Sequence, residues 1–250
     1  MYYNLLEEEN ITKIKPNYGY MQNQKDINEQ MRAILVDWII EVHCNYNLKE
    51  ETLFQTIWII DTYLSYEIVP RNKLQLLGVT SLLISCKYNE VIYPTIIEFI
   101  NITDKAYEIK DILKMEQEIL KKLDFNILVP LSLQFYDIIS KIFNFDNKQY
   151  YLGKYFMDSC LIDYNMICFS SSIIALSCAY IVTKFFNIKE YKILYYINNK
   201  NNISQQNLIK ESARKLCFIV KHLNQTNFNS IKKKYSLEKF GNVAKYCETP

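Results

Sequence analysis

The side chains that most often carry out enzyme chemistry are few in this chain, and they are not grouped. The two histidines, His43 and His222, are far apart in the sequence, and no glycine-rich phosphate-binding loop occurs. The seven cysteines include no CxxC pair, and no Cys/His cluster has the spacing of a metal site. We therefore expect a protein that is not an enzyme and needs no cofactor or metal, with each histidine on a helix face.

The residues best suited to recognising a partner lie in the run MRAILVDW, residues 31–38. With a rotation of about 100° per residue, a helix here has apolar side chains on two opposite faces. One face comprises Met31, Ile34, Leu35, Trp38 and Val42, and the other comprises Ala33, Val36 and Ile40. Only Asp37 and Glu41 clearly interrupt this apolar surface. Such a helix is either buried on all sides or offers an apolar strip edged by carboxylates to a partner.

The elements that position these residues are predicted to be helices. The composition, 50% hydrophobic and 22% charged, is globular, and helical spacing dominates a chain with only four glycines and five prolines. The predicted helices span residues 2–9, 28–46, 49–65, 72–89, 96–101, 110–123, 132–143, 149–162, 170–186, 189–197, 205–223 and 230–235. A linker at 125–130 divides them into two sets, and a polar loop is expected at 198–202. The sequence thus predicts an all-α protein with a short N-terminal helix.

Two of the predicted helices share one design. Helices 72–89 and 170–186 are apolar on almost every side and carry small residues that permit close approach of neighbours. Ala175 of the second helix stands 97 residues after Gly78 of the first. This spacing predicts two copies of one five-helix fold, each wrapped around a central buried helix.

Cysteine and charge patterns favour an intracellular protein. The cysteines are odd in number and lie mostly in apolar helical patterns, which predicts reduced residues in the core. Glu7-Glu8-Glu9 occupies the place where a signal peptide needs its apolar segment, and the longest apolar stretches, 74–86 and 173–182, are shorter than the roughly 20 residues of a membrane span. The net charge of +2 creates no overall field toward nucleic acid or lipid, and the basic run 232–234 is interpreted as a solvated helix face.

A series of short motifs follows one order along the chain. The motifs are Tyr20-Met21, Asp26-Ile27, MRAILVDW, KLQL at 73–76, SCKY at 85–88, Tyr93-Pro94, ITD at 102–104, Met115-Glu116 and LDF at 123–125. In order and spacing they resemble the cyclin box of A- and B-type mitotic cyclins, most strongly over residues 15–128. The two-lobed layout beyond Pro130 agrees with the second box of that family. The resemblance implies an N-terminal helix and connector at 1–23, a first cyclin box at 24–128, a second at 129–240 and a C-terminal tail at 241–250.

The resemblance also implies a partner, the catalytic subunit of a cyclin-dependent kinase. Lys87 and Glu116 would hold the backbone at the end of the kinase's regulatory C helix, and Leu120, Phe125 and Ile127 would supply the apolar part of that contact. A partner that binds only the helix-in state shifts the kinase toward its active arrangement, in cell-cycle control. Without the resemblance, Lys87 and Glu116 would be interpreted as ordinary solvated helix charges.

A second implied surface recruits substrates or inhibitors that carry a basic residue followed by a leucine. Its apolar pocket would comprise Met31, Ile34, Leu35, Trp38 and Leu74. Glu41 would meet the basic residue of the peptide, and Gln75 would bond to the peptide backbone.

The sequence departs from the family pattern in places. Asn89 stands where an acidic residue is usual, and Ile92-Tyr93-Pro94 replaces a tyrosine followed by two prolines. Thr62 follows Asp61 where an arginine is usual, so any internal partner of Asp61 must come from elsewhere.

Two rival interpretations remain open at this stage. A two-box scaffold of the transcription machinery would need a basic face and often a zinc ribbon, whereas this chain has three arginines and no ribbon. A transcription-type cyclin that still binds a kinase is a closer rival, although such proteins lack the full MRAIL-type strip. We expect a protein of the nucleus, the cytoplasm or both, with no nucleic-acid or membrane partner.

Overall fold

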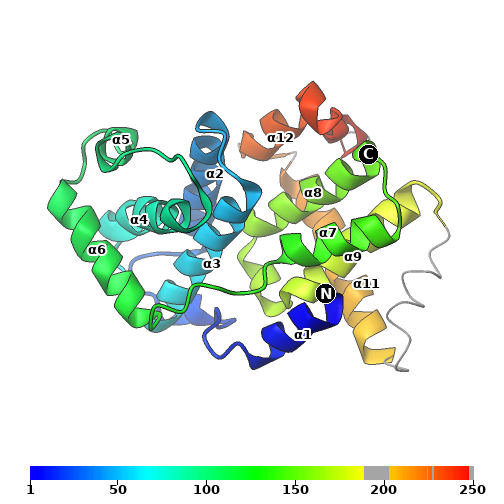
Figure 1. Cartoon of the computed structure of the whole chain (residues 1–250), viewed down its shortest axis with the longest axis horizontal. Helices are drawn as coiled ribbons and strands as arrows, with labels where there is room; N and C mark the ends of the chain where they lie inside the picture. The colour runs from blue at the N-terminus through cyan, green and yellow to red at the C-terminus, as the bar shows by residue number, and fades with distance from the viewer. Residues whose placement is uncertain (189–202, 224, 227, 248–250) are drawn as a thin grey trace. The chain divides into compact units, whose positions relative to one another are not determined.

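The structure is a computed structural model that describes residues 1–188, 203–223, 225, 226 and 228–247 (Figure 1). The predicted helix 189–197, the loop 198–202 and the last three residues of the predicted tail lie outside these residues. Within the described part of the chain every regular element is a helix, and no helix there is long and apolar enough to cross a membrane. The described α-helices begin and end within two residues of their predicted bounds.

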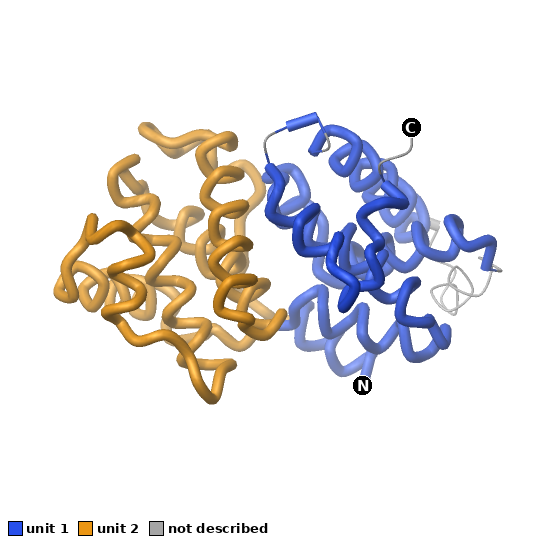
Figure 2. The backbone as a smooth tube through the Cα atoms, turned by 90° about the horizontal axis from the view of Figure 1, so that it is seen from above, with its two compact units in different colours: residues 1–10, 130–250 blue, residues 11–129 orange. Residues whose placement is uncertain are grey.

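The chain divides into two compact units, shown in different colours in Figure 2. One unit comprises residues 11–129, and the other comprises residues 1–10 together with 130–250. The first contains η1 (Tyr20–Asn23), α2 (Glu29–Asn45), α3 (Glu50–Tyr66), α4 (Arg71–Asn89), α5 (Ile96–Ile102) and α6 (Ile109–Lys122). The second contains most of α1 (Tyr2–Ile11), then α7 (Ser132–Ile142), α8 (Asn147–Ile162), η2 (Tyr164–Cys168), α9 (Ser171–Phe185), α11 (Ile203–Leu223), α12 (Ser230–Tyr235), η3 (Glu238–Phe240) and η4 (Val243–Cys247).

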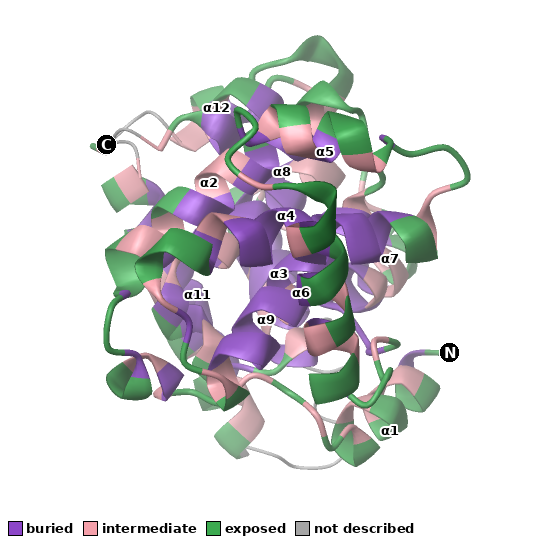
Figure 3. Cartoon of the chain, turned by 90° about the vertical axis from the view of Figure 1, so that its left-hand side faces the viewer, coloured by how far each residue is buried: buried purple, intermediate pink, exposed green. Residues whose placement is uncertain are grey.

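Each unit is built around one apolar helix. In the unit of residues 11–129 this is α4, which contacts α2, α3, α5 and α6, while α9 contacts α7, α8 and α11 in the other unit. Figure 3 shows α4 and α9 almost entirely buried, whereas α6 has an exposed outer face. Burying one Leu or Ile side chain stabilises a fold by about 1.5–3 kcal/mol. The buried side chains of α4 therefore outweigh the helix penalty of Gly78, which is about 1 kcal/mol at most.

Local signals explain where the helices of the 11–129 unit begin. The Asn28 side chain accepts a hydrogen bond from the Met31 backbone N–H at 3.0 Å, which caps α2. Thr95 and Glu98 form a reciprocal capping box at the start of α5. Pro70, in extended conformation, immediately precedes α4. These contacts fix the register with which α2 and α4 present their side chains.

The N-terminal helix α1 packs within the unit of residues 130–250. The Glu9 carboxylate accepts hydrogen bonds from the Ser172 backbone N–H at 3.0 Å and from the Ser172 hydroxyl at 2.5 Å. Ser172 lies in the first turn of α9, where backbone N–H groups lack helical partners and favour a negative charge. Tyr2 meets Phe135 of α7 edge to face, with ring centroids 5.6 Å apart.

The interpretation of residues 232–234 as a solvated face is wrong for Lys234. Its Nζ lies 2.7 Å from Oδ2 of Asp158, and both side chains are buried. The Tyr235 hydroxyl donates to the same oxygen at 3.0 Å. This ion pair joins α12 to α8. A buried charge destabilises the fold unless an opposite charge lies beside it, and Asp158 is that partner for Lys234.

The prediction that the cysteines pack in the core holds only in part. Cys86, Cys160 and Cys178 are buried, and burial raises the pKa of the Cys86 thiol to about 12. Cys168 and Cys217 are exposed, because their positions in η2 and α11 lie on outer faces that apolar spacing alone does not distinguish from inner ones. The described residues include all seven cysteines, and none of the seven forms a disulfide bond.

Candidate partner-binding surfaces

The first candidate surface follows α2 and the start of α4, and we call it the docking strip. It consists of Met31, Ile34, Leu35, Trp38 and Glu41 from α2 with Leu74 and Gln75 from α4. Ile34 is 53% exposed, and Glu41 is exposed as well. Met31, Trp38 and Gln75 are half-buried, whereas Leu35 and Leu74 are buried. The strip is therefore an accessible apolar surface whose floor belongs to the core.

The opposite face of α2 is held by a buried ion pair. Arg32 Nε lies 2.6 Å from Asp61 Oδ1, and Arg32 Nη2 lies 2.6 Å from Asp61 Oδ2, a bidentate arrangement. The Tyr20 hydroxyl donates to Asp61 Oδ1 at 2.8 Å. Burial alone lowers the pKa of a guanidinium, but the Asp61 carboxylate more than offsets this, and the pKa of Arg32 is raised. The internal partner of Asp61 is thus Arg32, and the pair turns Met31 and Ile34 outward.

Because Gly78 has no side chain, Leu35 can pack closely against α4 and form part of the floor of the docking strip. A Cβ atom built on Gly78 would be only 2.7 Å from Leu35 Cδ1 and 3.3 Å from Ile39 Cδ1. Any larger residue at this position of α4 would displace the end of the Leu35 side chain. The small residue that the sequence singled out therefore shapes the docking strip as well as the helix packing.

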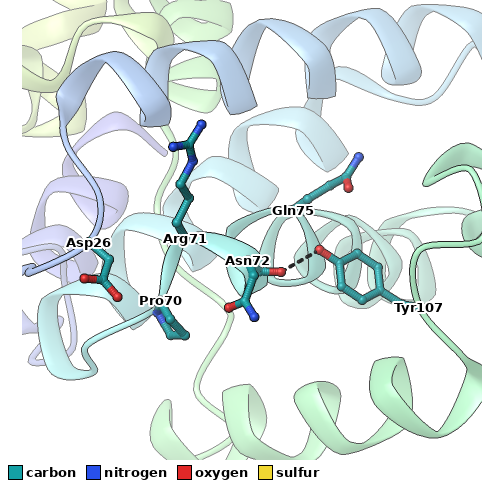
Figure 4. A pocket seen from close by; sticks show the side chains of 6 residues that line it. All are labelled: Asp26, Pro70, Arg71, Asn72, Gln75 and Tyr107. Carbon is teal, nitrogen blue, oxygen red and sulfur yellow. Dashed lines mark hydrogen bonds between the residues drawn. The ribbon is translucent and has the colours of Figure 1, made fainter.

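Two hollows adjoin the docking strip. One, of about 450 Å³, is lined by Trp38, Glu41, Val42, Asn45, Tyr46 and Ile102. The other, of about 520 Å³, is lined by Asp26, Pro70, Arg71, Asn72, Gln75 and Tyr107 (Figure 4). The Tyr107 hydroxyl donates to the Asn72 carbonyl at 2.9 Å, which holds one wall of the second hollow. Sequence reasoning missed Arg71 and Tyr107, because neither belongs to an apolar stripe.

The second candidate surface lies at the end of α4 and along α6. Lys87 Nζ is 2.6 Å from Glu116 Oε1, so the structure brings the two predicted charges together. The Lys87 side chain is 42% exposed and that of Glu116 is 13% exposed. An accessible pair of this kind contributes less than about 1 kcal/mol to folding, which leaves both groups available to a partner.

The apolar residues predicted for the same surface come from the end of α6 and the segment after it. Leu120 and Ile127 are half-buried, and Phe125 is 69% exposed. Phe125 has a positive φ of 54°, rare for an aromatic residue, and its N–H donates to the Leu120 carbonyl at 2.8 Å. Asp124, with φ of 50°, precedes it. This left-handed turn ends α6 and leaves the ring of Phe125 in solvent.

Asn89 connects the elements of this surface. Its Nδ2 donates to Gln55 Oε1 at 2.6 Å, and Gln55 Nε2 donates to the Ile127 carbonyl at 2.9 Å. The amide can donate to Gln55, which a carboxylate in its place cannot do.

Val91 and Ile92, both 89% exposed, follow Glu90, the residue that caps the end of α4. Ile92 was noted from the sequence only as part of a departure from the family pattern, and neither residue was assigned to a site. The sequence did contain a signal for an exposed apolar surface here, namely two adjacent apolar residues in a segment between helices.

Comparison with known protein families identifies both halves of the chain. The family described as "Cyclin, N-terminal domain" matches residues 1–128, and "Cyclin, C-terminal domain" matches residues 130–249. The chain belongs to the cyclin family. The predicted all-α fold of two tandem cyclin-box lobes and the predicted resemblance to mitotic cyclins are therefore confirmed.

The relatives of this cyclin include B-type members. It is 37% identical over 228 residues to "G2/mitotic-specific cyclin-B" of Spisula solidissima, covering 91% of this chain and 52% of the relative. It is 37% identical over 236 residues to "Cyclin-B2-1" of Arabidopsis thaliana, covering 92% of this chain and 53% of the relative. The cyclin thus spans about half the length of these relatives. A viral cyclin from herpesvirus saimiri shares the fold, with a TM-score of 0.72 at 16% identity, covering 86% of this chain and 97% of that one.

Proposed function

We propose that this cyclin binds and activates the catalytic subunit of a cyclin-dependent protein kinase and performs no chemistry itself. The observation that carries the proposal is the 2.6 Å contact of Lys87 with Glu116, from two different helices, beside the exposed ring of Phe125. An ammonium and a carboxylate side by side match the carbonyl and N–H groups at the end of a helix. The names of the relatives support a role in the mitotic cell cycle over the transcriptional alternative.

The activation follows from differential binding. A kinase needs its strand lysine paired with the C-helix glutamate before phosphoryl transfer, and a partner that binds only this state raises its population. To raise the active fraction of a kinase from 1% to 99%, a partner must bind the active state more tightly than the inactive state by about 5.5 kcal/mol. A large interface with apolar residues such as Phe125 and Ile127 around the charged pair can provide it. Such a complex acts inside the cell, in the nucleus, the cytoplasm or both.

We also propose that the docking strip recruits substrates or inhibitors with a basic residue followed by a leucine. The exposed Ile34, the half-buried Met31 and Trp38, and the buried floor of Leu35 and Leu74 support this role. Glu41 carries the charge that a basic residue requires, and the amide of Gln75 can both donate to and accept from a peptide backbone.

The kinase contact is tested by binding. The double variant Lys87→Ala with Glu116→Ala should weaken the affinity for a purified catalytic subunit by about 100-fold, because two charge-assisted bonds of roughly 1.5 kcal/mol each are lost. Isothermal titration calorimetry measures the affinity, and circular dichroism verifies that helix content is retained. Lys215→Ala with Glu211→Ala, which removes an accessible ion pair on α11, is the matched control and should leave the affinity unchanged. Unchanged affinity in the Lys87 and Glu116 variant would refute the assignment.

A further inference from the structure

Helix α11 has the same place in the second unit that α6 has in the first. Each packs against the central apolar helix of its unit, α9 or α4. The 97-residue spacing that relates the two central helices also relates the buried side chains of α6 and α11. Three buried residues of α6 each have a buried counterpart 97 positions later: Ile112 and Ile209, Met115 and Ser212, Ile119 and Leu216. The two helices therefore turn equivalent positions outward.

The outward face of α11 carries an aromatic residue that the packing of the unit does not require. Phe218 is 72% exposed, whereas the residue 97 positions earlier is the exposed Lys121 of α6. The ring of Phe218 lies parallel to that of His222, one turn further along α11, with an interplanar angle of 2° and centroids 6.4 Å apart. Since a lysine serves at the equivalent position of α6, the core does not explain the phenylalanine. Aromatic residues are enriched where proteins bind one another.

Positive charge surrounds the exposed ring. The α11 sequence contains four cationic side chains and one carboxylate, in a chain whose net charge is only +2. Arg214 stands one turn before Phe218 and Lys221 one turn after it, and both are exposed. Neither makes an ion pair with any residue that the structure describes. The carboxylate, Glu211, lies 3.4 Å from Lys215. Two cations beside the ring therefore remain available to an anion.

We propose that Arg214, Phe218 and Lys221 form a docking face for an acidic segment of a partner protein, with an apolar residue of that segment packed on Phe218. The two cations complement carboxylates by charge, and the guanidinium can bind one in bidentate fashion. From Arg214 to Lys221, α11 rises about 10 Å. A segment with carboxylates on both sides of a leucine therefore reaches both cations while the leucine covers the ring. The proposal depends on neither the docking strip nor the kinase contact.

A single-stranded nucleic acid is the competing occupant, because its bases stack on aromatic rings and its phosphates bind cations. The observations favour an acidic protein segment. Sites for single strands usually follow the backbone with a positively charged groove, whereas this face has two cations about 10 Å apart along one helix. Glu211, one turn before Arg214, would repel a longer polyanion.

The test uses the full chain and a fluorescent peptide with one leucine at its centre and two glutamates on each side, so that the direction of binding does not matter. One analogue has glutamine in place of every glutamate, and another has alanine in place of the leucine. Fluorescence anisotropy gives the affinities. The parent peptide should bind wild type about five- to tenfold more tightly than the glutamine analogue and about threefold more tightly than the alanine analogue. The first ratio should fall as salt rises, because exposed charges are screened.

Variants of the face assign the binding to it. Arg214→Gln with Lys221→Gln should bring the ratio between the glutamate and glutamine peptides to about one, and Phe218→Ser should weaken the parent peptide about fivefold. Two controls should change neither value. Leu208→Ser removes another exposed apolar side chain of α11, and Lys233→Gln removes an exposed cation of α12. Circular dichroism verifies the helix content of each variant.

Four outcomes would overturn the proposal. Equal affinity of wild type for the glutamate and glutamine peptides would mean that the face does not recognise acidic residues. An equal loss in Lys233→Gln would mean that only the overall charge matters. Tighter binding of a single-stranded oligonucleotide, lost in Phe218→Ser, would assign the face to nucleic acid. Loss of kinase activation in Phe218→Ser would assign the ring to the kinase contact.

Discussion

At the scale of single residues, the buried pair of Arg32 and Asp61 determines which face of α2 meets solvent. Arg32 stands inside the run MRAILVDW, and its side chain is 2% exposed. With the guanidinium held on Asp61 of α3, Ile34, two positions further along the helix and about 200° around it, must face away from the interior. Met31, one position before Arg32, is half-buried at the edge of the same outer face. The apolar side chains of Met31 and Ile34 are therefore accessible to a partner, because they are not fully packed into the core.

Replacing Arg32 should destabilise the fold strongly. Arg32→Met leaves the Asp61 carboxylate buried without its counter-ion, and the free energy of unfolding should fall by about 3–5 kcal/mol. Urea denaturation followed by circular dichroism measures the change. The double variant Arg32→Met with Asp61→Leu should recover most of the loss, since neither buried charge remains. A loss below 1 kcal/mol in the single variant would mean that the pair does not hold α2.

Much of the residue-level picture was accessible from sequence, and the reasons for the rest are physical. The spacing of Met31, Ile34 and Trp38 predicts a shared face, but spacing cannot tell which of two apolar faces is covered, because tertiary contacts decide it. The pairing of Lys234 with Asp158 joins residues 76 positions apart, and no local rule connects them. Lys87 and Glu116 were linked only through the resemblance to a family.

At the scale of elements, α4 serves both candidate surfaces. Its first turns carry Leu74 and Gln75 of the docking strip, its middle carries Gly78 beneath Leu35, and its last turn carries Lys87. The helix was predicted well because its apolar run lies between two prolines, Pro70 and Pro94, and the backbone is extended at Glu90, directly after the helix. What its sequence alone does not reveal is the 2.7 Å approach at Gly78.

Gly78→Ala should impair docking while leaving the fold intact. The new methyl group displaces the end of Leu35, whereas alanine favours the helix by about 0.5–1 kcal/mol over glycine. The affinity for a basic-x-leucine peptide should fall about fivefold or more, with thermal stability unchanged or raised, and kinase binding should be unaffected. In a Leu35→Ala background the same substitution should have no further effect on peptide affinity, because the clashing atoms are absent. An equal loss in both backgrounds would contradict this explanation.

The contact of α1 with α9 is a second prediction at this scale. Glu9→Ala removes the acceptor for the Ser172 N–H and hydroxyl at the start of α9, and the free energy of unfolding should fall by about 1–2 kcal/mol. Thermal unfolding measures the change. Glu7→Ala removes the same charge from an exposed position of α1 and should have no effect. Equal stability of the two variants would show that α1 is not held by this contact.

At the scale of the whole molecule, the chain consists of two helical units of similar construction. Each unit surrounds one apolar helix, α4 or α9, as the 97-residue spacing predicted. Both candidate surfaces are formed by residues 11–129 alone. The predicted helix at 189–197 lies outside the described residues, so the second unit is compared with the first only through its described helices.

The most direct test of the account is a kinase assay with two substrates. A purified cyclin-dependent kinase catalytic subunit is measured alone and with this chain, using a short peptide and a protein that carries a basic-x-leucine motif. Wild type should activate the kinase on both substrates and show no turnover by itself. Lys87→Ala with Glu116→Ala should abolish both activities, whereas Trp38→Ala should reduce only phosphorylation of the motif-bearing protein. Full activation by the Lys87 and Glu116 variant, or phosphorylation by the isolated chain, would contradict the account.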